Sequence, residues 1–165
     1  QDWMFNSDKL EQLIPLVQER AERFSDLVPL VNYLLGNVPA PCEADFEHNS
    51  LQRSDVLKIL HHTLAAFDEM REWRRDALFE LCQQLAAELG LKFRDFLFPL
   101  FIATSGRAVS LPLFDSWIFM GTDLARARLR AAMDALGVSN KERKRLDKEY
   151  QAFRSARTAA NGGGN

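Results

Sequence analysis

The sequence contains little cysteine and no long apolar run. Cys42 and Cys82 are its only cysteines and do not form a Cys-x-x-Cys pair, so a disulfide framework is not expected. This usage fits a reducing compartment, and we expect a cytoplasmic protein. No apolar stretch approaches the roughly 20 residues that a membrane-spanning helix requires, and no signal-peptide pattern is present. A membrane partner is therefore not expected.

Motifs typical of catalysis and metal binding are also missing. The sequence has no glycine-rich phosphate-binding loop and no Gly-x-Ser-x-Gly motif. His61 and His62 are neighbours on a predicted helix, so they point about 100° apart and cannot chelate one metal as an i, i+4 pair does. His48 and Cys42 lie in a predicted loop without a second pair of ligands. These absences indicate a binding protein without a metal rather than a catalyst.

Charge is present but unevenly distributed. The 165 residues carry a net charge of −2 and are enough for one domain or two small ones. Residues 1–99 contain 10 Lys and Arg against 17 Asp and Glu, whereas residues 100–165 contain 11 against 6. This asymmetry suggests an anionic partner at the C-terminal end. Because the chain starts at Gln1 and ends in Asn-Gly-Gly-Gly-Asn, we expect a piece of a longer protein.

Apolar spacing predicts helices almost throughout and no strand, so the expected fold class is all-α. The first two helices are predicted over residues 7–24 and 25–36, and residues 36–50 form a loop. Ser139 or Asn140 is the expected cap of the last helix. The later helices are predicted over residues 51–71, 73–89, 93–103, 112–120, 123–136 and 141–154.

A small polar group, Thr104-Ser105-Gly106-Arg107, interrupts the apolar segment between Phe96 and Trp117. Gly106 permits a turn, and Pro112 favours the start of a new helix. Small polar groups, a positive charge and an exposed aromatic ring are what an unpaired base needs for stacking and edge contacts. The alternative is a helix–turn–helix corner whose phenylalanines all lie in the core. The residues that could gather at a base-binding rim are Phe101, Ser105, Gly106, Arg107, Ser110, Leu113 and Phe114.

Several motifs follow one another in a fixed order along residues 10–137. They are the segment LIPLVQERAERFSDLVPLVNYLL, Glu72-Trp73, Pro99-Leu100-Phe101-Ile102-Ala103-Thr104-Ser105-Gly106, Pro112-Leu113-Phe114, and Met120-Gly121 followed by Ala125-Arg126-Ala127-Arg128-Leu129. This ordered set resembles the C-terminal, anticodon-binding region of bacterial glutamyl-tRNA synthetases, which are class I aminoacyl-tRNA synthetases. The resemblance implies an all-helical cage of two subdomains. Residues 1–46 would form the C-terminal part of the first subdomain and residues 47–137 the second. The chain then continues past the usual end of the family, and there we expect a basic helical extension at 138–157 and a disordered tail at 158–165.

The resemblance also implies a function. Such a region binds the anticodon stem-loop of glutamate tRNA, while an N-terminal catalytic domain of the same monomeric chain joins glutamate to the tRNA with ATP and Mg. This sequence has no segment like His-Ile-Gly-His or Lys-Met-Ser-Lys, so we expect it to be inactive alone and to hold no cofactor. The rival hypothesis is a helical protein-interaction module with a Phe-rich docking groove. A steep salt dependence of binding would favour RNA over such a groove.

The resemblance assigns anticodon recognition first to Arg20. This residue stands at the position whose arginine reads the third anticodon base in members that reject glutamine tRNA. A planar guanidinium suits the task because it can donate two hydrogen bonds to a base edge or stack on it. The alternative is a surface arginine paired with Glu19 or Glu22.

Other expected anticodon contacts lie around the polar interruption. Leu113 and Phe114 match positions that pack and stack on the anticodon, and Ser110 matches a short polar residue near the bases. We therefore expect the Phe114 ring to be at least partly exposed. Phe101 stands where the family usually has an arginine, and Arg107 could replace that charge.

The expected basic extension has 7 Lys and Arg against 3 Asp and Glu over residues 138–157. Leu146, Tyr150 and Phe153 form a narrow i, i+4, i+7 stripe, which predicts a helix that docks on the body. Its basic face could contact tRNA phosphates, or it could be an ordinary solvated face with charge pairs. The expected tRNA-backbone contacts are Arg126, Arg130, Lys141, Arg145 and Lys148.

Overall fold

The computed structural model describes residues 11, 14–15, 31–35, 40–107 and 111–163. Within these ranges the chain forms helices and no β-strand, apart from one isolated bridge between His48 and Leu51. The all-α prediction is confirmed. The helices are η1 (Tyr33–Leu35), η2 (Glu43–Phe46), α3 (Arg53–Glu69), α4 (Arg75–Glu88), α5 (Phe93–Ser105), α6 (Leu113–Met120), α7 (Thr122–Ala135) and α8 (Asn140–Gly162).

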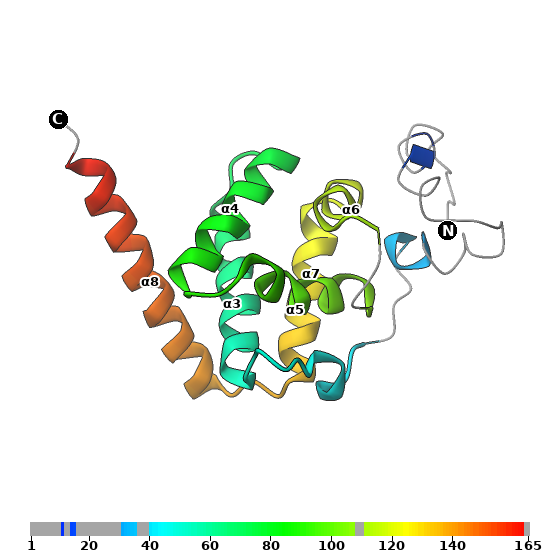
Figure 1. Cartoon of the computed structure of the whole chain (residues 1–165), viewed down its shortest axis with the longest axis horizontal. Coiled ribbons are helices and arrows are strands. Elements are labelled where there is room, and N and C mark those ends of the chain that lie inside the picture. The colour runs from blue at the N-terminus through cyan, green and yellow to red at the C-terminus, as the bar shows by residue number, and fades with distance from the viewer. Residues whose placement is uncertain (1–10, 12–13, 16–30, 36–39, 108–110, 164–165) are drawn as a thin grey trace.

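The core forms around α3, which packs against α4, α5, α7 and α8 (Figure 1). The apolar stripe of α3 explains its central place, because Ile59, Leu60 and Phe67 are all buried. Trp117 on α6 is also fully buried, and its ring lies 5.0 Å from that of Phe67. These helices form one hydrophobic cluster that reaches from Phe46 to Tyr150.

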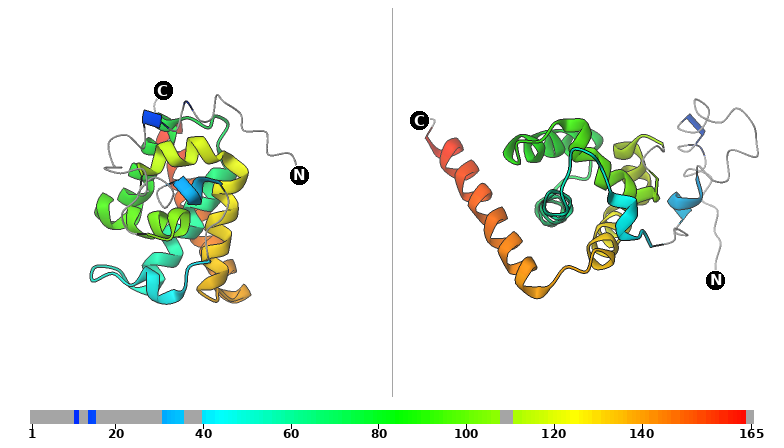
Figure 2. Two further views of the ribbon diagram at one scale, coloured as in Figure 1. Left: turned by 90° about the vertical axis from the view of Figure 1, so that its right-hand side faces the viewer. Right: turned by 60° about the horizontal axis from the view of Figure 1, so that its bottom comes forward.

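The long helix α8 lies along one side of the molecule, and α3 lies between it and α7 (Figure 2). Leu146 and Tyr150 are buried against the body and Phe153 is half-buried, so the predicted docking stripe is confirmed. At the start of α8 the Ser139 hydroxyl accepts from the Glu142 N–H at 3.1 Å, while the Glu142 carboxylate accepts from the Ser139 N–H at 2.8 Å. This capping box identifies Ser139 as the cap.

The predicted boundaries of the later helices hold to within a few residues, with one exception. α8 continues to Gly162, whereas the sequence placed its end near residue 154 and a disordered tail from residue 158. Alanine-rich residues such as Ala159 and Ala160 favour helix, which explains the continuation. Most of the expected first subdomain, including Arg20, lies outside the described residues, and the division at 46/47 stays a prediction.

Candidate nucleic-acid interface

The polar interruption after α5 is a tight turn at the end of a largely buried helix. Gly106 adopts a left-handed conformation with φ of 74°, and its N–H donates to the Ile102 carbonyl at 2.8 Å. Only glycine adopts this conformation without strain, and the predicted turn is confirmed. The buried Ser105 hydroxyl donates to the Phe101 carbonyl at 2.9 Å and accepts from the Arg107 N–H at 3.3 Å. The turn thereby holds the backbone of Arg107, whose side chain is exposed.

A network of hydrogen bonds connects this turn to three other elements. The Trp117 indole N–H of α6 donates to the Thr104 hydroxyl at 2.9 Å. Arg128 of α7 donates through Nη1 to the Thr104 carbonyl at 2.5 Å and through Nη2 to the Tyr33 carbonyl of η1 at 2.6 Å. The Tyr33 and Ser116 hydroxyls share a further hydrogen bond of 2.7 Å. The end of α5 is therefore connected to α6, α7 and the η1 segment.

Sequence reasoning assigned no role to Arg128, although a signal was present. Ala125, Leu129 and Ala132 form the buried stripe of α7, and Arg128 falls within that stripe rather than on the outer face. A charged residue in an apolar stripe indicates buried hydrogen-bond partners, because an unpaired buried charge is costly. Burial lowers the pKa of the Arg128 guanidinium, and the two carbonyls that it contacts offset the loss of water.

An aromatic cluster fills the space between α4, α5 and the start of α6. The Phe79 ring lies 5.4 Å from Phe93 and 5.5 Å from Phe114, and the Phe114 ring lies 5.8 Å from Trp117. Phe114 is only 8% exposed, whereas Phe79 is 36% exposed. The expectation of an exposed Phe114 ring is therefore wrong. The physical reason is that α6 packs against α4, which places Phe79 next to Phe114.

The other expected anticodon residues fall into three groups. Phe101 is half-buried against the core and Arg107 is exposed, so both have surface available near the turn. Leu113 is buried, as is Ser105, whose hydroxyl is engaged within the turn. Ser110, like Arg20, lies outside the described residues.

Known proteins match most of this chain. Residues 1–133 match the family model described as the anticodon binding domain. The chain belongs to this family. Among similar proteins, the glutamate–tRNA ligases of Saccharophagus degradans, Marinobacter nauticus and Alcanivorax borkumensis are 41%, 37% and 36% identical to it. The alignments cover 92%, 93% and 91% of this chain, but the chain spans only 30%, 31% and 31% of these relatives.

Helix α8 of this anticodon-binding domain lies beyond the family match and has two different faces. All three acidic residues of its basic extension are engaged with α3. Each contact joins a carboxylate of α8 to a basic side chain of α3, either an arginine, a lysine or a histidine. They are Glu142 with Arg53 at 2.8 Å, Asp147 with His61 at 2.6 Å, and Glu149 with Lys58 at 3.3 Å.

The outer face of α8 carries cations without such partners. Lys141, Lys144, Arg145 and Lys148 are exposed, and within the described part of the chain none of them forms an ion pair. Their spacing of i, i+3, i+4, i+7 places them on one side of the helix. We call these four residues the basic stripe. Lys144 was missing from the sequence-based set, although the same spacing could have identified it.

The two basic residues expected on α7 do not join the basic stripe. Arg126 is paired with Asp68 of α3, and its side chain is 29% exposed. The existing ion pair weakens its candidacy as a phosphate contact. Arg130 is exposed. Arg130 lies on a different helix from the basic stripe; α7 and α8 meet where Asp134 pairs with Arg143 at 2.7 Å, and α3 lies between them further along (Figures 1 and 2).

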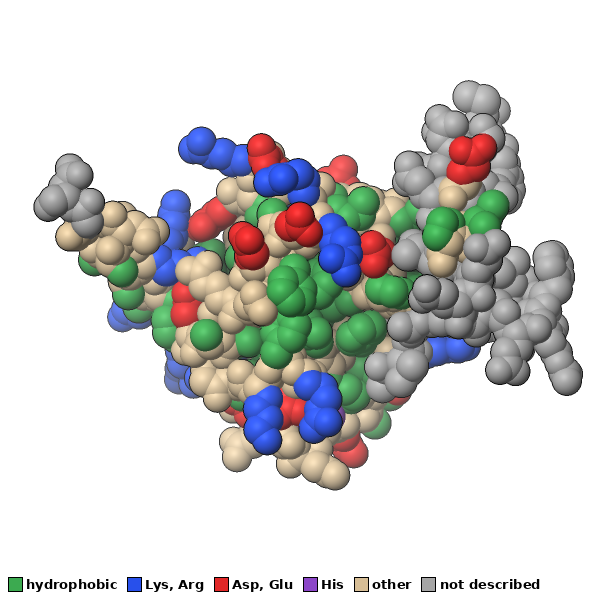
Figure 3. Space-filling view, turned by 45° about the horizontal axis from the view of Figure 1, so that its top comes forward, with side chains coloured by type: hydrophobic (Ala, Val, Ile, Leu, Met, Phe, Trp, Pro, Cys, Tyr) green, Lys and Arg blue, Asp and Glu red, His purple; other side chains and the backbone are tan. Residues whose placement is uncertain are grey.

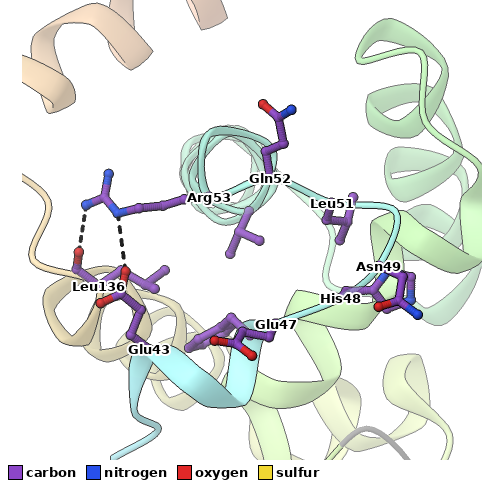
Figure 4. A pocket seen from close by; sticks show the side chains of 10 residues that line it. Glu43, Glu47, His48, Asn49, Leu51, Gln52, Arg53 and Leu136 are labelled. Carbon is purple, nitrogen blue, oxygen red and sulfur yellow. Dashed lines mark hydrogen bonds and ion pairs between the residues drawn. The ribbon is translucent and has the colours of Figure 1, made fainter.

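A pocket of about 530 Å³ opens between η2, the loop that follows it and the start of α3 (Figure 4). At its edge the Arg53 guanidinium donates to the Leu136 carbonyl at 2.7 Å and to Glu142, and it lies 3.8 Å from Glu43. The hydrogen bond from Arg53 is the main cause that lowers the pKa of Glu142 to about 2. Arg53 therefore joins the start of α3 to the end of α7 and the start of α8.

The interface between α3 and α8 also contains a buried histidine. His62 is fully buried, with ring centroids 5.5 Å from Tyr150 and 5.8 Å from Phe153. Burial is the main cause that lowers its pKa to about 4, and the nearby His61 adds to the effect. His62 is therefore neutral at neutral pH and contributes to packing.

No group of three or more His, Cys, Asp or Glu side chains among the residues that the structure describes could hold a metal ion. Across those same residues, no helix combines the length and apolar character that crossing a membrane requires. The free thiol of Cys82 is buried, and burial raises its pKa, so it behaves as a core residue.

Proposed function

We propose that this chain is the anticodon-binding region of a glutamate–tRNA ligase and binds the anticodon loop of glutamate tRNA. The observation that carries the proposal is that glutamate–tRNA ligases align with more than nine-tenths of the chain. The remainder of the parent protein, which includes its N-terminal catalytic domain, would attach glutamate with ATP and Mg. The parent would act as a monomer in the cytoplasm.

Base recognition in this proposal centres on the turn after α5. Arg107 and Phe101 have surface available there, and the hydrogen-bond network from Arg128 and Trp117 to Thr104 stabilises the backbone beneath them. A rigid support matters because ordering a flexible loop would cost affinity. Arg20 and Ser110 remain proposed anticodon contacts, whereas the buried Ser105, Leu113 and Phe114 would act by supporting the turn and the start of α6.

Phosphate contacts in this proposal come mainly from the basic stripe on α8. Four exposed cations on one side of a helix, with the acidic residues turned to the body, form a surface of net positive charge. Such contacts position RNA but carry no sequence information. Arg126 and Arg130 remain proposed backbone contacts on a separate helix, α7, and the pair with Asp68 makes Arg126 the weaker of the two.

The test is a titration of the chain with two anticodon stem-loops at one salt concentration. One loop has the third anticodon base C of glutamate tRNA, and the other has the G of glutamine tRNA. We expect tighter binding of the first, and we expect the substitution Arg20→Gln to narrow the ratio of the two dissociation constants more than it weakens binding. Absence of RNA binding would refute the proposal and favour the protein-interaction module. An unchanged ratio with both affinities lowered equally would make Arg20 a phosphate contact.

A further inference from the structure

The ring of Phe79 occupies an unusual position in the aromatic cluster. It is the member that is most open to solvent, at 36%, while its neighbour Phe114 is 8% exposed. Phe79 lies on α4, 22 residues before Phe101 and 35 residues before Phe114, outside the motifs that suggested anticodon contacts. Figure 3 shows one face of the molecule, on which apolar side chains gather at the centre with charged side chains of both signs around them.

The orientation of the Phe79 ring is held by its neighbours. Phe93 and Phe114 both contact it edge to face, with interplanar angles of 74° and 75°. Edge-to-face contacts at these distances are favourable for aromatic pairs. The ring is therefore ordered before any ligand arrives, and binding to it costs less side-chain entropy than binding to a free ring would.

The charges near Phe79 favour a neutral ligand over a phosphate. Asp76 and Glu80, which are exposed, lie on the same helix within one turn. The guanidinium of Arg75 is engaged with Asp115 at 3.3 Å. A phosphate near the ring would meet the carboxylate of Asp76, which lies one turn earlier on the same side of α4, whereas the face of a base carries no net charge. Gln83, one turn after Phe79 on the same side of α4, exposes an amide that can donate to and accept from a base edge.

We propose that an unpaired base of the bound anticodon loop stacks on Phe79, while Phe93 and Phe114 hold the ring from below. This inference rests on the proposed function. Phe114 then supports the stacking ring and does not itself stack on a base. Because the rings of Phe79 and Phe114 are in contact, the proposed base site adjoins the start of α6. Stacking on an aromatic ring is the sequence-tolerant contact that single-stranded RNA uses.

A protein partner is the weaker candidate for this surface. Among the described residues, the large hydrophobic side chains that are exposed are Ile14, Phe79 and Ile118. Specific protein interfaces bury about 800 Å² on each partner and have an apolar centre. The exposed area of one phenylalanine ring beside carboxylates is closer to the area of a single base than to that of a protein interface.

The experiment compares Phe79→Leu with Ile118→Ala in the complete 165-residue chain. Leucine keeps apolar packing against Phe93 and Phe114 but removes the ring. Ile118 is a matched control because it is 37% exposed and lies on the neighbouring helix α6. Phe79→Tyr keeps the ring and serves as the conservative variant. Circular dichroism melts report whether each variant stays folded.

Stem-loops of glutamate tRNA in which 2-aminopurine replaces each anticodon-loop base in turn serve as probes. We expect one position to change fluorescence on binding to the original chain and to the Tyr variant, and to lose that change with Phe79→Leu. The affinity of Phe79→Leu should fall by about 5- to 140-fold, which corresponds to the 1–3 kcal/mol of one stacked base. Ile118→Ala should bind as the original chain does.

The opposing outcomes are distinct. If the original chain binds no stem-loop, the proposed function fails and this inference fails with it. If the original chain binds while Phe79→Leu keeps both affinity and the fluorescence change, the inference alone is overturned. Equal losses from Phe79→Leu and Ile118→Ala would also overturn it, because a general effect on packing would then explain both.

Discussion

Neutralising the basic stripe of α8 should change the salt dependence of RNA binding without unfolding the domain. The perturbation replaces Lys141, Lys144, Arg145 and Lys148 by glutamine in one chain. All four side chains are exposed and free of ion pairs among the described residues, so little folding energy is lost. Glutamine has a helix propensity close to that of lysine and arginine. Deletion of α8 would be less informative, because it would also remove the buried Leu146 from the core.

The size of the effect follows from the number of unpaired cations. Each phosphate contact contributes about 0.7–0.9 to the slope of log affinity against log salt concentration. Four contacts would therefore contribute about 3 to the slope. Between 50 and 200 mM salt the original chain should then lose about 60-fold more affinity than the neutralised variant.

The assay is a fluorescence-anisotropy titration at several salt concentrations with the C-type and G-type stem-loops. Both stem-loops should weaken together, since phosphate contacts carry no sequence information. The matched control exchanges lysine and arginine at the same four positions, which preserves the charge and should preserve the slope. The reasoning is refuted if the neutralised helix stays folded and the slope does not change. A loss confined to one stem-loop would also refute it.

Two further predictions concern stability. Phe114→Ala should lower the free energy of unfolding by about 3–5 kcal/mol, because it removes a buried ring from the cluster; a denaturant melt that shows no change, with weaker RNA binding, would return Phe114 to the surface. His62 should make the domain less stable in acid, because its pKa of about 4 lies below the usual histidine value of 6.5, so the unfolded chain binds the proton first as the pH falls. Stability should be full above about pH 6.5 and should decline towards pH 4 by about 3 kcal/mol; His62→Gln should flatten this decline in pH-dependent melts, and an equally steep decline in the variant would contradict the assignment.

The polar interruption after α5 shows how local and distant effects divide at the candidate site. Gly106 predicted the turn, because a left-handed backbone conformation depends only on the residue that adopts it and on its sequence neighbours. The burial of Phe114 could not be predicted from local sequence in this way. It depends on α4 packing against α6, which brings Phe79 into contact with a residue 35 positions later. Arg128 is a third case, because its place in an apolar stripe indicated burial but its partners Thr104 and Tyr33 lie on separate elements.

The sequence by itself determined the all-α class, the later helices to within a few residues, the turn at Gly106 and the docking stripe of α8. Each of these follows from periodicity or from the conformational preference of one residue. Only the tertiary structure decided which α8 charges are engaged. The carboxylates of Glu142, Asp147 and Glu149 contact basic side chains of α3. Among the described residues, the cations of the basic stripe form no ion pair. Spacing along a helix places residues on one side of it, but the helices that pack together determine which side faces water.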